Sequence, residues 1–96
     1  MSDTRRNDAM LLALEQEFAT LVSRVNEAGS AEGELFDALC SNVGRVTGAD
    51  AFSVEGLAAK SRVGALLEAN GWHELLELVA QSIARDAFRL TVPATL

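Results

Sequence analysis

Apolar residues recur at helical spacing through nearly the whole chain, and this periodicity is the feature that most restricts the fold. Between Asp8 and Ala28 they follow one another at intervals of three and four residues. They are Leu11, Leu14, Phe18, Leu21 and Val25, with Met10 and Val22 beside them. The chain has no alternating run rich in Val, Ile and Thr that would indicate a strand. The pattern therefore predicts an all-α protein.

Three further segments show the same period. The predicted helices span about residues 8–28, 31–47, 54–69 and 72–90. Gly29, Gly48 and the Asn70-Gly71 pair stand where the first three should end, and Pro93 stops the fourth at Val92. Short links favour antiparallel neighbours, so we expect a compact four-helix bundle or an orthogonal four-helix array.

A four-residue phrase, Ser-Xaa-Glu-Gly, occurs at residues 30–33 and again at residues 53–56. Serine is a preferred N-cap residue, and an acid in the first turn complements the helix dipole. Both copies therefore predict helix starts, with Ser30 and Ser53 as the caps. Such an N-terminus can also bind phosphate. Because Glu32 and Glu55 would occupy or repel that site, we expect caps rather than anion sites.

The predicted third helix is rich in small side chains. They are Gly56, Ala58, Ala59, Ser61, Gly64 and Ala65. Small residues let a neighbouring helix approach closely, so we expect this helix to be the central or most tightly packed one.

The length of 96 residues indicates a single helical domain over residues 1–96, with short flexible termini at about 1–6 and 92–96. The lone Cys40 cannot form an intramolecular disulfide, and its place on an apolar stripe predicts a buried thiol in a reducing compartment. The polar first ten residues argue against a signal peptide or a membrane span. These observations predict a cytoplasmic protein.

Groups for catalysis are scarce. His73 is the only histidine and Cys40 the only cysteine, and nothing in the sequence pairs either with a nucleophile or base. Glu74 and Glu77 lie one helical turn apart, but two carboxylates on a solvated face fall short of a metal cage. We therefore expect no enzymatic activity, no metal and no cofactor.

The charge balance disfavours nucleic acid as a partner. The chain carries 14 acids and 8 bases, a formal net charge of -6, and aromatic residues make up only 5%. The leading hypothesis is a non-enzymatic protein-protein interaction module. The alternative is a DNA-associated or phage-linked regulator in which the third and fourth helices form a helix-turn-helix. Its phosphate contacts would be Lys60, Arg62, Arg85 and Arg89.

Two features are candidate protein interfaces. The seam of the first helix, formed by Leu11, Leu14, Phe18, Leu21 and Val25, suits either a core face or a self-association face. In so small a domain the core face is favoured, and a homodimer through the first or second helix is the other interpretation. Trp72, the only tryptophan, is a candidate anchor, although its spacing with Leu76 and Val79 also suits a core position.

The C-terminal half carries a resemblance. Residues 53–63 contain Glu55-Gly56-Leu57 followed by Lys60, and residues 82–90 contain Ser82 followed by Ala84-Arg85-Asp86. This pattern resembles small helical proteins of alphaproteobacteria, many of them uncharacterised or encoded near prophage genes. The resemblance covers about the last forty residues and implies a bacterial cytoplasmic setting without implying an activity.

Overall fold

The computed structural model describes residues 2–29 and 33–91, with side chains from Arg6 onward. Within these ranges the chain forms four helices and no strands, so the predicted all-α class is confirmed. The helices are α1 (Ser2–Ala28), α2 (Glu34–Gly48), α3 (Val54–Ala69) and α4 (His73–Thr91).

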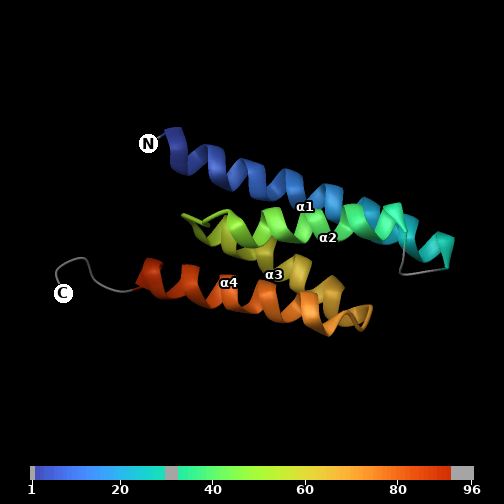
Figure 1. Cartoon of the computed structure of the whole chain (residues 1–96). Coiled ribbons are helices and arrows are strands. Elements are labelled where there is room, and N and C mark those ends of the chain that lie inside the picture. The colour runs from blue at the N-terminus through green and yellow to red at the C-terminus, as the bar shows by residue number, and fades with distance from the viewer. Residues whose placement is uncertain (1, 30–32, 92–96) are drawn as a thin grey trace.

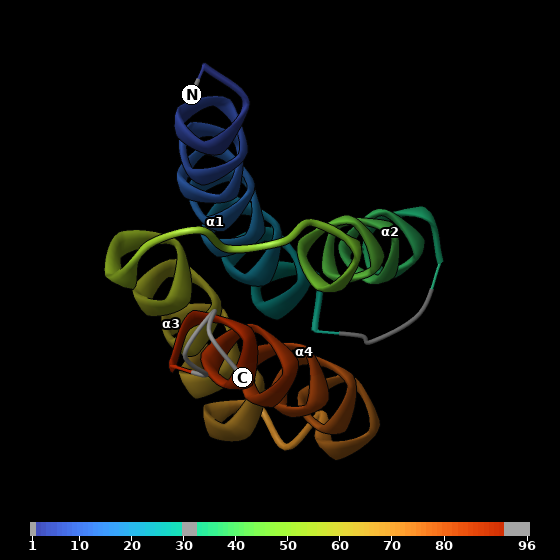
Figure 2. The ribbon, with the colours of Figure 1, turned by 90° about the vertical axis from the view of Figure 1, so that its left-hand side faces the viewer.

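Successive helices run antiparallel and form a ring of four (Figures 1 and 2). α1 packs on α2 and α3, and α4 packs on α3 and α2. The α2–α3 link, residues 49–53, crosses one end of the bundle, which we call the link end. The opposite end holds the turn of residues 70–72 between α3 and α4, and we call it the turn end.

The core consists of two buried apolar clusters. The larger one contains Phe18, Val43 and Leu67 and lies toward the turn end, whereas the smaller one contains Leu11 and Ala51 and lies toward the link end. All five seam residues of α1 are buried within the single chain, with exposed fractions of 8% or less, and they are Leu11, Leu14, Phe18, Leu21 and Val25. The seam is therefore occupied by α2 and α3 in this fold.

Two predicted helix starts are wrong. α1 begins at Ser2 instead of Asp8, so most of the segment expected to be a flexible terminus is helical. α2 begins at Glu34, not near residue 31, and its N-cap is Gly33, with φ of 85° and no side-chain cap. Positive φ suits a residue without Cβ, so Gly33 replaces Ser30 as the start signal. Residues 30–32 and 92–96 lie outside the described ranges.

The other boundaries divide into confirmed and corrected ones. Ser53 caps α3 as predicted, since its Oγ accepts a hydrogen bond from the Gly56 backbone N–H (3.3 Å). Gly29 and Gly71 adopt the positive φ expected of helix-terminating glycines. Gly48, in contrast, is the last residue of α2 with no positive φ, and the extended Ala49 follows it.

α3 is not central, because the ring gives each helix two main neighbours, but for its length it is the most tightly packed helix, as the alternative prediction has it. Its small residues have a more specific use at Gly56. A Cβ at that position would lie 2.6 Å from Asp8 Oδ1 and 3.0 Å from the Ala51 Cβ. The absent side chain therefore makes room for a carboxylate of α1, whereas a Cβ at Gly64 would meet only ordinary contacts, the nearest at 3.6 Å.

Candidate functional site

An open apolar cavity of about 460 Å³ lies between α2 and the start of α4, at the turn end. Its lining residues are Phe36, Cys40, Gly71, Trp72, His73, Glu74 and Leu75. We call this feature the groove. Phe36, Trp72 and Leu75 also pack against the larger core cluster, so the floor of the groove is continuous with the core.

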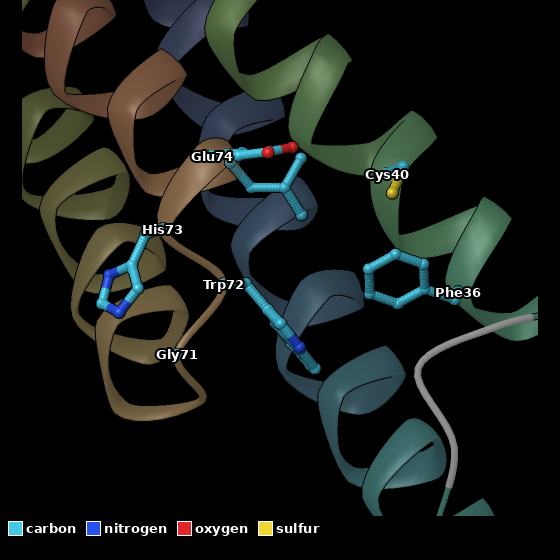
Figure 3. Close-up of a pocket in the computed structure, with 7 residues that line it drawn as sticks. Phe36, Cys40, Gly71, Trp72, His73 and Glu74 are labelled. Atoms are coloured by element: carbon cyan, nitrogen blue, oxygen red, sulfur yellow. The ribbon is translucent and has the colours of Figure 1, made fainter.

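Two aromatic side chains form the groove's most distinctive contact. Phe36 of α2 and Trp72 meet edge to face, with ring centroids 5.6 Å apart and planes inclined at 69°. Figure 3 shows the two rings pointing toward one another from their separate elements, while His73 points away from them. Trp72 is positioned by the Gly71 turn, and its carbonyl accepts the first backbone hydrogen bond of α4, from Leu76.

Cys40 lies one helical turn after Phe36 and lines the same cavity (Figure 3). The thiol was expected to be buried, but it is only half-buried because α4 leaves this part of α2 uncovered. Burial, and secondarily the charge of Asp37, raise the pKa of the Cys40 thiol. The thiol form is thereby favoured, so the only cysteine is a poor nucleophile that nonetheless borders an open site.

A buried network of polar side chains lies at the link end, away from the groove. Lys60 of α3 and Asp86 of α4 form a salt bridge with both side chains fully buried. Lys60 Nζ also donates a hydrogen bond to Ser82 Oγ (2.7 Å), and Ser82 Oγ donates to the Thr47 carbonyl (3.0 Å). A buried ion pair offsets its desolvation cost only when further hydrogen bonds complete it, as they do here.

The same network holds the α2–α3 link. Asp86 Oδ2 accepts a hydrogen bond from the Ala51 backbone N–H (3.2 Å), and Arg89 donates to Asp86 Oδ1 (3.2 Å) and to the Ala51 carbonyl. The Arg89 guanidinium also lies over the Phe52 ring, 5.1 Å from its centroid. The link is thus fastened to α4 through both its backbone and a side chain.

Lysine beside serine is an arrangement that some hydrolases use, in which a neutral amine activates the hydroxyl. Here the Asp86 carboxylate pairs with the Lys60 amine, and the Ser82 hydroxyl is directed at a carbonyl. Both side chains are buried and neither lines the cavity described above. The arrangement connects α2, α3 and α4 and presents no nucleophile to a substrate.

The N-terminus of α3 is occupied by a carboxylate that the sequence did not point to. Asp8 Oδ1 accepts a hydrogen bond from the Phe52 backbone N–H (3.1 Å), and Asp8 Oδ2 accepts one from Ser53 Oγ. The expectation that this terminus is no free anion site rested on Glu55, which is exposed. Asp8 of α1 fills the position instead and joins α1 to the link.

The cations proposed for DNA contact are engaged elsewhere. Lys60 is fully buried, which excludes it from a phosphate contact in this fold. Arg62 forms a two-bond ion pair with Glu15, and this interaction raises the pKa of the guanidinium. Arg85 and Arg89 face Asp50 at 3.9 and 3.7 Å. The four residues therefore form no common exposed basic surface.

Sequence reasoning named Trp72 but missed its partners in the groove and the members of the buried network. Asp86 lies on the apolar stripe of α4, seven residues after the buried Val79. Lys60 lies on the buried stripe of α3, between Gly56 and Val63. Opposite charges at core positions of two adjacent helices are a readable signal for a buried pair. Phe36 gave no comparable signal, and the place of Cys40 on an apolar stripe predicts a buried thiol instead of one that borders an open site.

In comparisons with known proteins, no protein-family model, no curated protein and no solved structure matches this chain. Over the described residues, no three His, Cys, Asp or Glu side chains gather as a metal site would require. In the same part of the chain no helix combines the length and the apolar character needed to cross a membrane.

Proposed function

We propose that this chain is a non-enzymatic protein-binding module of a bacterial cytoplasm and that the groove between α2 and α4 is its binding site. One observation carries the proposal: the Phe36–Trp72 contact lies at the wall of an open apolar cavity. Aromatic residues are enriched at the centres of protein interfaces, where they provide rigid contact area. The bacterial cytoplasmic setting rests on the C-terminal resemblance and the single free cysteine.

The groove also has the form of a pre-formed site. Its floor is the main core, so an occupant would rest on side chains that already have fixed positions. Pre-formed sites require little ordering on binding, which favours affinity. A homodimer is a second form of the proposal, and because the α1 seam is buried within the single chain, such a dimer would use another surface.

Selection from a displayed library of random peptides tests the proposal with the full chain. We expect selected peptides to bind with a Kd below about 100 µM. They should slow alkylation of Cys40, the only cysteine, and shift the fluorescence of Trp72, the only tryptophan. Attaching a bulky disulfide reagent to Cys40 should block binding, and reduction should restore it, without any mutation.

Phe88→Ala is the matched control, because Phe88 is 70% exposed and lies near the C-terminal end of α4, away from the groove. This variant should bind the selected peptides as the wild type does. A library that yields no binder, or binders that leave Cys40 alkylation unchanged, contradicts the proposal. Sedimentation equilibrium at micromolar concentration tests the homodimer, and a monomer throughout eliminates it.

A further inference from the structure

We infer that the partner seated in the groove is a basic amphipathic helix of another protein. The inference rests on the proposed function and adds the chemistry of the partner. Three properties support it: the distribution of charge over the two ends of the molecule, the extent of the apolar groove, and the repulsion that like charges would cause in a dimer formed through the groove.

Charge is distributed unequally between the two ends. Most cations of the chain lie at the link end or mid-bundle and face acids there, as in the Arg45–Glu17 (2.9 Å), Arg62–Glu15 (2.6 Å) and Lys60–Asp86 pairs. The turn end holds a group of acids on the one or two turns of each helix nearest to it. Among described side chains these are Glu27, Glu34, Asp37, Glu68, Glu74 and Glu77, with Arg24 as the accompanying arginine.

None of those six acids forms an ion pair with any described side chain. Glu34, Asp37 and Glu74 lie in the first turns of α2 and α4, the two helices that border the groove. Their distribution produces a negative potential around an apolar floor, and such a potential favours and steers a cationic partner. An acidic partner, including nucleic acid or an anionic lipid surface, is disfavoured by the same potential.

The extent of the groove suits a helix. α2 and α4 run in the same direction (Figure 1), and the lining residues Phe36 and Cys40 lie one turn apart on α2. Leu78, 50% exposed, lies one turn beyond Leu75 and extends the apolar surface along α4. An amphipathic helix inserts residues spaced at i, i+3, i+4 and i+7 into a groove of this kind, while its flanks meet the rim. Basic flanks would meet the acidic rim.

A second copy of this chain fits less well. A two-fold dimer through the groove applies the same surface to itself and would bring the acids of both turn ends together. Like charges juxtaposed across an interface oppose association. The charge of the groove's surroundings therefore favours a different protein as the partner.

Three synthetic peptides of about 18 residues test the inference. They share one apolar seam of Leu and Phe, with flanks of Lys and Arg in the first and of Glu in the second, and the third is the basic peptide with its sequence scrambled. We expect the basic amphipathic peptide to bind at least about tenfold more tightly than the other two. Its affinity should fall between ~50 and ~300 mM salt because screening weakens charge attraction. It should also protect Cys40 from alkylation.

The Asp37→Lys/Glu74→Lys double variant supplies the matched reversal, since both residues are exposed and form no ion pair among the described side chains. Circular dichroism checks that this variant folds, and it should lose most of its preference for the basic peptide over the acidic one, because the two reversals nearly cancel the net negative charge of the turn end. Two results would overturn the inference: equal affinity for the basic and acidic peptides, or a scrambled peptide that binds as well as the amphipathic one.

The outcomes separate this inference from the proposed function. If library-selected peptides without basic residues occupy the groove, the binding module stands and the basic partner is wrong. If no peptide protects Cys40, the binding module itself fails. A dimer in which Cys40 is protected identifies the occupant as a second copy and also overturns the inference.

Discussion

The two ends of the bundle use polar residues in opposite ways. At the link end, Lys60, Asp86 and Ser82 are buried and bonded to one another, and Asp8 accepts hydrogen bonds from two groups of the link region. At the turn end, which holds an aromatic groove, the exposed acids form no ion pairs with described side chains, and one of them, Glu74, lines the groove.

This difference separates groups that maintain the fold from groups that are available to a partner. A link that crosses the bundle leaves backbone groups that must find partners, and the buried Asp86 and the exposed Arg89 supply them here for Ala51. A tight turn such as Asn70-Gly71 satisfies its own backbone, with Gly71 N donating to the Glu68 carbonyl (3.0 Å). Side chains near the turn are therefore free of that structural task.

Substitution of Lys60 gives the largest expected effect. Lys60→Met leaves the buried Asp86 carboxylate without its main partner, so the free energy of unfolding should fall by about 3–5 kcal/mol. The matched control is the double variant Lys60→Met/Asp86→Asn, which removes both charges and keeps an acceptor for the Ala51 N–H. Urea denaturation should show that the second substitution recovers at least half of the loss. If Lys60→Met unfolded at the same urea concentration as the wild type, the buried network would not maintain the fold, and the contrast between the two ends would be wrong.

Removal of the Asp8 carboxylate should have the next largest effect. Asp8→Ala deletes a charged acceptor of hydrogen bonds from Phe52 N–H and Ser53 Oγ. Hydrogen bonds to charged groups contribute more than neutral ones, and we expect a loss of about 2 kcal/mol in the free energy of unfolding. The control is Glu55→Gln in the first turn of the same helix, where an exposed acid should contribute no more than about 1 kcal/mol. If Asp8→Ala and Glu55→Gln lowered the free energy of unfolding equally, Asp8 would contribute no more to the N-terminus of α3 than the exposed Glu55 does.

The sequence predicts the helices better than it predicts the links. Periodicity and terminating glycines located all four helices, because helical burial imposes a local period that survives in any helical fold. At the start of α2, a serine followed by an acid predicts a cap at Ser30, whereas the helix begins after Gly33, which supplies the required positive φ. The Asp8 contacts join residues more than forty positions apart, and no local pattern records them.

The candidate site was only partly predictable for the same reason. Trp72 was recognised from its rarity and its place behind a glycine. Its partner Phe36 lies on another helix, and whether the two bound a core or a groove depends on how closely α2 approaches α4. The distance between α2 and α4 is a property of tertiary packing, and the spacing of residues along either helix does not predict it.

Neutralising turn-end acids should change stability little. Glu68→Gln and Glu77→Gln remove exposed charges that form no ion pair with described side chains, so each should alter the free energy of unfolding by no more than about 0.5 kcal/mol. Urea denaturation at low salt measures the change. A loss comparable to that of Asp8→Ala would mean that these acids maintain the fold, which would contradict the contrast between the ends.

The pH dependence of Cys40 is the smallest expected effect and probes the groove directly. Burial and the Asp37 charge raise the pKa of the folded thiol above that of the unfolded chain. The folded state therefore binds the proton more tightly, and the stabilisation is complete below the unfolded pKa and is lost as pH rises through the folded one. Alkylation of the folded chain should accelerate at higher pH than alkylation of the urea-unfolded chain. Asp37→Asn should move the folded profile part of the way back, because burial is the larger cause. Coincident folded and unfolded profiles would show that solvent reaches the thiol freely, and the groove would then lack the apolar floor on which an occupant would rest.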